Sequence, residues 1–321
     1  MTQLKARIAA KRIEALDICS FELVPVANVN FPAFEAGAHI DLHLPGLPVR
    51  QYSLCNAPSD AQRYQLAILR EPQSRGFSRR MHDDVQIGDV IEISSPKNHF
   101  ALASAMDEAV LIAGGIGVTP ILAMAEALHD AGVPFTLHYC TRSPERAAFV
   151  DRLRAADWAD RVSLYFDDDQ ANRRLDLSAL LAHRSPGKHL YFCGPSGFLD
   201  WIKTAAAAQG WPADQVHCEY FSGTVETRDS DQAFEIEIAE TGQIITVAKG
   251  QTALSAMVAA GIDVPCSCEE GVCGMCMTPV KEGTPDHRDQ FLTEAERARG
   301  DVFMPCCSRS VSARLVVAPD Y

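Results

Sequence analysis

The spacing of the cysteines near the carboxyl end constrains this chain more than any other feature. Six of the eleven cysteines lie between residues 266 and 307, and three of them form the run Cys268-x4-Cys273-x2-Cys276. Residues 1–7 are polar and lack the apolar region of a signal peptide, so we expect a cytoplasmic protein. Because a reducing compartment disfavours disulfides, clustered cysteines are then either buried thiols or metal ligands.

A fourth thiol follows at a distance, at Cys306. A C-x4-C-x2-C run with one remote cysteine is the spacing of a plant-type [2Fe-2S] ferredoxin, whose loop wraps three thiolates around the cluster. Zinc is the alternative metal, but zinc knuckles favour two separate C-x2-C pairs. Gly271 inside the four-residue gap suits a loop whose backbone N–H groups point at bridging sulfides. The sequence therefore predicts a [2Fe-2S] cluster held by Cys268, Cys273, Cys276 and Cys306.

Two further cysteines, Cys266 and Cys307, do not fit this ligand spacing. Cys307 directly follows Cys306 on a segment that we expect to be extended, so its side chain should point to the opposite face. Both are interpreted as packing residues.

Length and sequence pattern predict three domains. A chain of 321 residues with 47% hydrophobic side chains is too long for one ordinary core. Short alternating segments with Gly and Pro between them indicate an antiparallel β-barrel, and apolar strands alternating with helical segments indicate a parallel α/β sheet. A hairpin and a short helix precede the cysteine loop and indicate an α+β domain of the β-grasp type. The expected bounds are 1–103, 104–225 and 226–321, with a polar linker at about 222–232.

Charge narrows the range of partners. The formal net charge is −13 and the pI is near 5.2, which argues against a nucleic-acid surface or an anionic membrane surface. No apolar stretch reaches the roughly 18 residues of a membrane-spanning helix. Residues 231–321 hold 14 Asp and Glu against 7 Lys and Arg, so this end can steer toward a basic protein partner, although a solvated acidic surface explains the same count.

Two segments of the middle domain are typical of dinucleotide binding. Gly114-Gly115-Ile-Gly117-Val-Thr119-Pro120 lies between an expected strand and an expected helix, where glycines let the backbone approach a pyrophosphate. Its spacing is not G-x-G-x-x-G, so a plain tight turn remains an alternative. A second segment, Tyr191-Phe-Cys193-Gly194-Pro195-Ser-Gly197, follows another strand; a packing thiol is the alternative for Cys193.

The first domain carries two segments suited to a flavin. In Arg50-Gln51-Tyr52-Ser53, the cation can bind phosphate, the aromatic ring can pack along a flavin, and the hydroxyl can hydrogen-bond its redox-active edge. Arg75-Gly76-Phe77-Ser78 opens an expected helix, whose N-terminus offers a phosphate seat.

These motifs, taken in order, resemble the phthalate dioxygenase reductase family within the ferredoxin reductase superfamily, and the resemblance covers essentially the whole chain. Met304-Pro-Cys-Cys-Ser-Arg309 resembles the family's fourth-ligand segment, in which the first thiol is the ligand, and this selects Cys306. The resemblance further implies that Cys193 lies beside the nicotinamide, that Thr119 borders the flavin, and that Phe221 covers it. Ser53, Thr119 and Cys193 are accordingly the expected catalytic residues.

The resemblance also implies the cofactors and the partner. Relatives with a carboxyl-terminal ferredoxin domain hold FMN, and no long insertion follows Ser78 that could fold over an adenosine. NADH is favoured over NADPH, although Arg142 or Arg146 near Thr141 could pair with a 2′-phosphate. The terminal acceptor is expected to be a separate Rieske oxygenase that acts on an aromatic acid.

A flavin is required between the two electron carriers, because hydride chemistry moves two electrons and a [2Fe-2S] cluster accepts one. Two other functions remain open. One is a self-contained reductase that passes electrons to a small acceptor, and the other is an iron–sulfur sensor.

Overall fold

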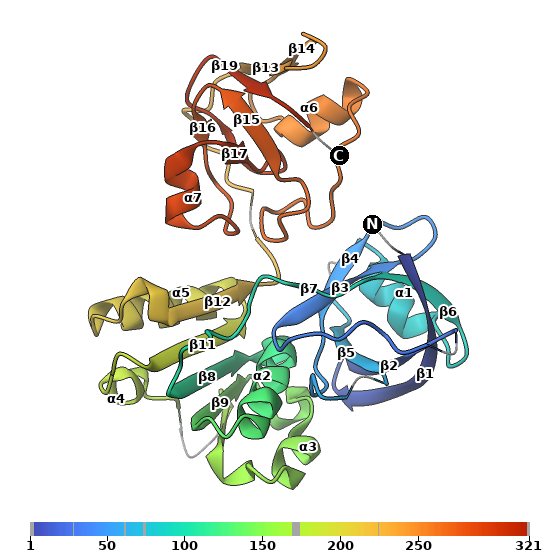
Figure 1. Cartoon of the computed structure of the whole chain (residues 1–321), viewed down its shortest axis with the longest axis vertical. Coiled ribbons are helices and arrows are strands. Elements are labelled where there is room, and N and C mark those ends of the chain that lie inside the picture. Colours follow the sequence, from blue (N-terminus) through green and yellow to red (C-terminus); the bar gives the residue numbers. More distant parts are fainter. Residues whose placement is uncertain are drawn as a thin grey trace. The chain divides into compact units, whose positions relative to one another are not determined.

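The computed structural model describes residues 3–27, 29–60, 62–72, 75–168, 174–223 and 225–319. The chain divides into two compact units, Met1–Phe221 and Ser222–Tyr321 (Figure 1). The first unit contains an antiparallel sheet and a parallel sheet, and the second contains a mixed sheet. None of the helices in these described ranges has the length and apolar character that crossing a membrane requires.

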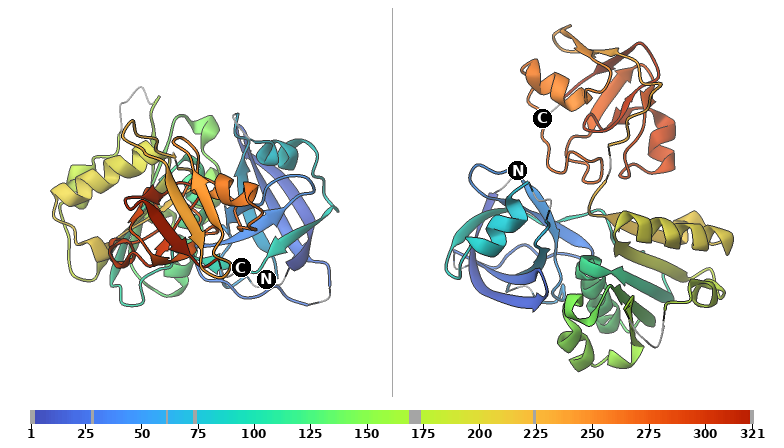
Figure 2. Two further views of the ribbon diagram at one scale, coloured as in Figure 1. Left: turned by 90° about the horizontal axis from the view of Figure 1, so that it is seen from above. Right: turned by 180° about the vertical axis from the view of Figure 1, so that it is seen from behind.

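The antiparallel sheet is formed by the amino-terminal residues, which curl into a barrel-like shape (Figure 2). Its strand order is β4-β3-β6-β1-β2-β5, with β7 paired to β3. The N–H of Cys55, just after β4, donates to the carbonyl of Gln65 on β5 at 2.8 Å, which brings the two ends of the sheet together. The elements are β1 (Gln3–Ala15), β2 (Ile18–Pro25), β3 (Ala38–His43), β4 (Arg50–Ser53), β5 (Tyr64–Leu69), α1 (Phe77–Asp83), β6 (Val90–Ser94) and β7 (Lys97–Asn98).

Alternation decides which side chains of β3 enter the barrel core. Ile40 and Leu42 are fully buried in one cluster with Phe77 and Met81 of α1. His39 and Asp41 alternate with them in sequence and therefore leave the opposite face of the strand, beside β4 and β7.

The parallel sheet has the order β10-β9-β8-β11-β12, as expected for a doubly wound α/β domain. The apolar run of β8 is buried on both faces: Leu111 packs in a cluster with α2, and Ile112 packs in another with α4 and α5. The elements are β8 (Glu108–Gly114), α2 (Val118–Asp130), β9 (Phe135–Thr141), α3 (Val150–Ala155), β10 (Val162–Phe166), α4 (Leu177–Leu181), β11 (Lys188–Gly194), α5 (Ser196–Ala208) and β12 (Val216–Tyr220). Single 3-10 turns occur at Gly115–Gly117, Pro144–Arg146, Ala159–Arg161 and Ala213–Gln215.

Arg152 of α3 joins the two sheets of the first unit. Its guanidinium donates to the carbonyl of Cys55 at 2.9 Å and to the side chain of Gln65 at 3.2 Å. It also pairs with Glu126 of α2 at 3.0 Å. One cation therefore ties helices α2 and α3 to the end of β4.

The second unit combines a five-stranded mixed sheet, in the order β14-β13-β19-β15-β17, with helix α6. The expected hairpin is confirmed as the antiparallel pair β13–β14, and β13 also pairs in parallel with β19, as in a β-grasp domain. The Thr252 side chain caps α6, and a capping box of Thr293 and Glu296 begins α7. The elements are β13 (Phe234–Ile238), β14 (Ile244–Val247), α6 (Ala253–Ala259), β15 (Thr278–Glu282), β16 (Pro285–Asp286), α7 (Glu294–Arg299), β17 (Val302–Phe303), β18 (Arg309–Ser310) and β19 (Arg314–Val317).

A buried ion pair fastens part of the expected linker to this unit. The side chains of Arg288 and Asp231 are 3% and 4% exposed, and their closest N···O distance is 2.5 Å. Arg288 also donates to the carboxylate of Asp286 at 2.5 Å and to the carbonyl of Glu226 at 2.8 Å. Residues 226–231 are therefore bound to the ferredoxin unit.

We predict that Arg288→Gln lowers the free energy of unfolding of the second unit by about 3 kcal/mol, because the Asp231 carboxylate then stays buried without its cation. Arg314→Gln is the matched control, since Arg314 pairs with Glu235 and Glu237 on an exposed surface and should change stability little. Chemical denaturation monitored by circular dichroism measures both. Equal effects of the two variants would contradict a special role for the buried pair.

The same pair predicts the response to acid. Hydrogen bonds from Arg288 lower the pKa of Asp231 below its usual value of 3.8, so the folded state favours the ionised carboxylate. The stabilisation is complete above that value and is lost as the pH falls below it. In Arg288→Gln, the acid-dependent loss of stability should be smaller than in the parent protein.

Candidate functional site

The four cysteines predicted as ligands meet in the second unit. Cys268, Cys273 and Cys276 lie in the loop between α6 and β15, and Cys306 lies in the turn between β17 and β18. Hydrogen bonds from the thiols of Cys273 and Cys306 lower the pKa of Cys268, and contact with Cys306 lowers the pKa of Cys276. Two segments that are far apart in sequence thus bring their sulfurs to one place.

The backbone of the loop is shaped around these sulfurs. The N–H of Glu270 donates to the Cys268 sulfur at 3.3 Å, and the N–H groups of Val272 and Met275 reach the sulfurs of Cys268 and Cys273. Gly274 has a positive φ of 71°, and a Cβ there would lie 2.3 Å from the Phe291 ring. Donors aimed at sulfur and a loop that needs glycine fit a [2Fe-2S] cluster.

The two remaining cysteines of this region are Cys266 and Cys307. Cys266 packs against the core of the unit. For Cys307, the expected extended conformation is wrong, because residues 305–307 form a turn in which the N–H of Cys307 donates to the Met304 carbonyl at 3.1 Å. Its sulfur packs against Gly271, where a Cβ would approach it to 2.4 Å. Cys306 contacts Cys268, Cys276 and Cys307 and so lies at the centre of the thiol group.

The proposed flavin motif lies on β4, at the edge of the barrel. Tyr52 is partly buried and its ring lies 5.9 Å from the ring of Phe77, and Arg50 donates to the Val49 carbonyl at 2.8 Å. Gln51 donates to the Asp41 carboxylate at 3.1 Å, on the opposite face of the strand. Ser53 is buried at the end of β4, where the parallel domain meets the barrel.

The second flavin segment opens helix α1. Gly76 precedes the helix with a φ of 107°, a conformation that favours glycine, and Arg75 is exposed beside it. Phe77 is buried in the barrel core, and the Ser78 hydroxyl accepts a hydrogen bond from the N–H of Glu71 at 3.2 Å. The segment thus places an exposed cation and a glycine next to the Tyr52–Phe77 aromatic pair, which fits a flavin phosphate.

The two glycine-containing loops of the parallel domain lie against each other. A Cβ on Gly117 would lie 2.2 Å from the carbonyl oxygen of Cys193, and the Phe198 ring fills the space beside both Gly114 and Gly194. Gly115 has a positive φ of 54°. Together with the exposed Pro195 at the start of α5, these residues form the carboxyl end of the sheet, where α/β folds bind nucleotides.

Thr119 and Cys193, both expected to act in catalysis, are buried in this place. The Thr119 hydroxyl donates to the Ile116 carbonyl at 3.1 Å, which fixes the first turn of α2. Cys193 is fully buried, and this burial raises the pKa of its thiol well above the ordinary value, so the thiol is neutral.

The residues expected to select the dinucleotide lie at the end of β9. The hydroxyl of Thr141 is buried and donates to the Ser143 carbonyl at 3.0 Å, and Arg142 is exposed. Arg146 pairs with Asp17 of the barrel at 3.5 Å.

One residue of the site, Glu219, was missed by sequence reasoning. It pairs in register with Cys193 across β11 and β12, and the Ser53 hydroxyl donates to its carboxylate at 3.4 Å. Burial raises the pKa of Glu219 to about 8. The only sequence signal was an acidic residue in an otherwise strand-like run. Phe221, two residues further on, is 39% exposed just after β12.

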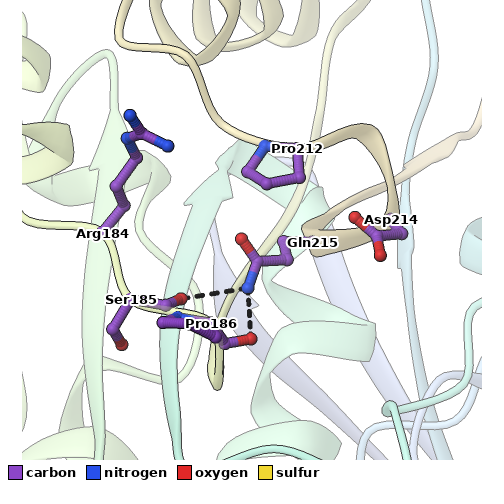
Figure 3. Close-up of a pocket in the computed structure, with 6 residues that line it drawn as sticks. All are labelled: Arg184, Ser185, Pro186, Pro212, Asp214 and Gln215. Atoms are coloured by element: carbon purple, nitrogen blue, oxygen red, sulfur yellow. Dashed lines mark hydrogen bonds between the residues drawn. The ribbon is translucent and has the colours of Figure 1, made fainter.

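A surface pocket elsewhere in the parallel domain is not part of this site. Its volume is about 480 Å³, and Figure 3 shows its lining residues. These residues precede β11 and β12, so the pocket lies at the amino ends of the two strands, opposite the edge that carries Cys193. Gln215 donates to the Ser185 carbonyl at 3.0 Å and closes its floor. The lining residues are Arg184, Ser185, Pro186, Pro212, Asp214 and Gln215.

Comparisons with known proteins agree with this geometry. Residues 236–311 match the 2Fe-2S iron-sulfur cluster binding domain. A vanillate O-demethylase oxidoreductase from Pseudomonas sp. (strain HR199 / DSM 7063) is 46% identical over 97% of this chain and 98% of its own length. The solved structure of phthalate dioxygenase reductase, described as modular and made for electron transfer from pyridine nucleotides to [2Fe-2S], is 36% identical, with a TM-score of 0.74 over 98% of both chains.

This chain belongs to the phthalate dioxygenase reductase family. The phenoxybenzoate dioxygenase subunit beta of Ectopseudomonas oleovorans is a further relative, 44% identical over 99% of this chain and 98% of its own length. As a reductase of this family, the chain is an oxidoreductase, and the expected architecture of antiparallel, parallel and ferredoxin domains is confirmed.

We predict that Cys306→Ser abolishes the visible absorption and the bound iron of the cluster, because the sulfur that meets both Cys268 and Cys276 is lost. Cys307→Ser is the matched neighbour and should keep both signals. Iron analysis and visible spectra of the two purified variants decide this. Equal loss in both would contradict the assignment of Cys306.

We predict that Gly117→Ala destabilises the first unit by about 1–3 kcal/mol, because the new methyl group would overlap the Cys193 carbonyl. Gly197→Ala is the control, since a Cβ at Gly197 meets nothing within 4 Å. Thermal unfolding measures both variants. A stable Gly117→Ala protein with full nucleotide affinity would show that the two loops are not tightly apposed.

Proposed function

We propose that this protein is the NADH-dependent reductase component of a Rieske oxygenase or O-demethylase system, with FMN in the barrel domain and a [2Fe-2S] cluster in the ferredoxin unit. The convergence of the four thiols is the observation that carries this proposal. It offers a site for a one-electron carrier on the same chain as a parallel sheet whose carboxyl end is suited to bind a nucleotide. The names of the relatives support the oxygenase, since they include an O-demethylase oxidoreductase and a dioxygenase subunit. Eleven free cysteines suit the reducing environment of the cytoplasm.

Each part of the first unit has a role in binding. The backbone of residues 114–117 and the N-terminus of α2 are suited to the pyrophosphate of NADH. The exposed Arg75 and the half-buried Gly76 are suited to the phosphate of FMN, and Tyr52 is suited to the flavin ring. The pairing of Arg146 with Asp17 at 3.5 Å supports NADH over NADPH, because it engages one of the two candidate partners for a 2′-phosphate; the other, Arg142, is exposed.

Bound flavin supplies the exchange between a two-electron hydride donor and a one-electron acceptor. The chain positions the reactants and excludes water. Ser53, Cys193 and Glu219 come from three strands of two sheets and meet at their junction. The neutral Cys193 thiol and the largely neutral Glu219 place little charge there, which favours close approach of a nicotinamide.

A protein acceptor is favoured over a small dye, quinone or ferric chelate. The ferredoxin unit contains twice as many acidic as basic residues, although arginines pair with several of the acids, including Asp231, Glu235 and Glu237. The acids outside these pairs can steer the unit toward a basic patch.

The direct test uses the purified holoprotein. NADH added without oxygen should bleach both the flavin and the cluster absorption, denaturation should release FMN, and a Rieske oxygenase should turn over only when the reductase is present. Release of FAD would contradict the flavin assignment. Rapid reduction of dyes with no support of any oxygenase would favour the self-contained reductase, and cluster-dependent folding without NADH oxidation would favour a sensor.

We predict that Cys193→Ala slows flavin reduction by NADH by about tenfold, because a smaller side chain beside the nicotinamide loosens the reacting geometry. Cys218→Ala is the matched control, since Cys218 lies on the neighbouring strand in register with Phe192 and faces the other side of the sheet. Stopped-flow spectrophotometry gives both rates. An unchanged rate in Cys193→Ala would remove the residue from the reacting centre.

A further inference from the structure

Part of the chain that was expected to be a linker lies along the ferredoxin unit. Within the expected range of 222–232, Val225 packs against the core of this unit. The guanidinium of the buried Arg309 donates to the Gln232 carbonyl at 2.9 Å. These contacts add to the buried ion pair that holds residues 226–231. Most of the expected linker is therefore part of the ferredoxin unit, and only a short piece of chain is left to connect the two units.

Gly223 attaches the beginning of this chain directly to the cysteine loop. The N–H of Gly223 donates to the Glu270 carboxylate at 3.1 Å. A Cβ on Gly223 would lie 2.2 Å from the carbonyl oxygen of Glu270 and 3.0 Å from a methyl group of Val272. Because glycine has no Cβ, the backbone can approach the loop this closely. Any other residue at this position would push the chain away from the loop.

The loop residues that Gly223 contacts also face a predicted ligand. Glu270 and Val272 both lie in the four-residue gap of the cysteine motif, and their N–H groups reach the sulfur of Cys268. The nitrogen of Glu270 lies 3.3 Å from that sulfur. The interdomain chain is thus attached to the same two residues that present backbone donors to a sulfur of the predicted cluster.

On the other side of the connection, the parallel sheet ends at Tyr220, the last residue of β12. The Tyr220 hydroxyl accepts a hydrogen bond from the Lys203 amine at 2.9 Å, which fixes this end to α5. Between Tyr220 and Gly223 lie Phe221 and Ser222, both exposed. Three peptide links span about 11 Å at most when fully extended. The free connection is therefore a tether of two residues, much shorter than the linker expected at 222–232.

The length of this tether matters for transfer between two carriers on one chain. A short tether raises the effective concentration of one carrier at the other, and this concentration falls as a flexible tether lengthens. On the basis of the function proposed above, we propose that Gly223 is a positioning residue for electron transfer. It fastens the interdomain chain to the cysteine loop, limits the free tether to Phe221 and Ser222, and so keeps the cluster within reach of the flavin. In each transfer the reduced flavin loses one electron and the oxidised cluster gains it, and no covalent bond forms or breaks.

The first test lengthens the tether in the holoprotein. A Gly-Ser pair inserted between Phe221 and Ser222 doubles the number of free residues and leaves the contact of Gly223 with the loop intact. Because effective concentration falls with roughly the −3/2 power of length, electron transfer from flavin to cluster should slow about threefold. Laser-flash reduction of the bound flavin starts the transfer, and bleaching of the cluster absorption gives its rate. The same pair inserted between Thr241 and Gly242, in the exposed turn between β13 and β14, is the matched control and should leave the rate unchanged.

The second test removes the anchor. In Gly223→Ala the new methyl group overlaps the Glu270 carbonyl, so the chain should leave the loop and the tether becomes longer. Transfer should then slow by about threefold or more. Ser222→Ala is the matched neighbour, since Ser222 is exposed, and it should transfer electrons at the rate of the parent protein. The insertion variant decides the question if Gly223→Ala does not fold.

Readouts independent of turnover separate positioning from a merely structural role. A longer tether changes how often the carriers meet and leaves each carrier as it is. The iron content, the midpoint potential of the cluster and the rate of flavin reduction by NADH should therefore be the same in the insertion variant and the parent. Hydrogen exchange of the parent holoprotein should show a protected amide at Gly223, as expected for its hydrogen bond to Glu270.

Several results would overturn this role of Gly223. They are an unchanged transfer rate in the insertion variant or in Gly223→Ala, a slowed rate that scales with lost iron or a shifted cluster potential, and an unprotected Gly223 amide. Equal slowing by the insertion between Thr241 and Gly242 would also contradict it, because that insertion does not lengthen the tether. A parent holoprotein whose cluster stays oxidised after NADH has reduced the flavin would contradict the proposed function. A parent that transfers electrons normally, with variants that match it, would contradict the tether alone.

Discussion

Four sulfurs from two distant segments must be held within the width of one cluster, and the ferredoxin unit is organised around this requirement. Residues 286–292 form hydrogen bonds with both of these cysteine-bearing segments. The N–H of Gln290 donates to the Gly271 carbonyl of the cysteine loop at 2.9 Å, and the N–H of Arg288 donates to the Ser308 hydroxyl, beside the fourth ligand, at 3.1 Å. The buried Asp289 carboxylate accepts from the N–H of Leu292 at 2.7 Å and keeps the segment folded. Arg288 also forms the buried ion pair with Asp231. The same few residues therefore attach residues 226–231 to the ferredoxin unit and support the two segments that carry the cysteines.

A comparable constraint acts where the barrel meets the parallel sheet. Hydride transfer requires two rings in contact without water between them, so the groups that hold each ring must converge. The absence of a side chain at Gly117 lets α2 begin directly against the end of β11, and Ser53 reaches from β4 to Glu219 on β12. Because His39 of β3 is the register partner of Ser53, the polar face of β3 lies next to the same point.

Local pattern was sufficient for much of this architecture. Alternation in β3 and the continuous apolar run of β8 predicted an antiparallel and a parallel sheet, and the cysteine spacing predicted the ferredoxin domain; all three are confirmed. The individual site residues stay predictions. The sequence alone could not show which residues from distant segments come into contact. Ser53 hydrogen-bonds to Glu219, 166 positions away, and Arg288 pairs with Asp231, 57 positions away. The prediction of an extended segment at Cys307 was wrong for a similar reason. The N–H of Cys307 donates to the Met304 carbonyl and forms a turn, which the pattern of alternation does not reveal.

The central claim is that electrons from NADH reach the cluster held by Cys268, Cys273, Cys276 and Cys306 within one chain. Electron paramagnetic resonance of the holoprotein, frozen after NADH is added without oxygen, tests it most directly. The account predicts the spectrum of a reduced [2Fe-2S] cluster, with up to one unpaired spin per chain on the cluster. Bleached flavin absorption with no cluster signal would contradict it.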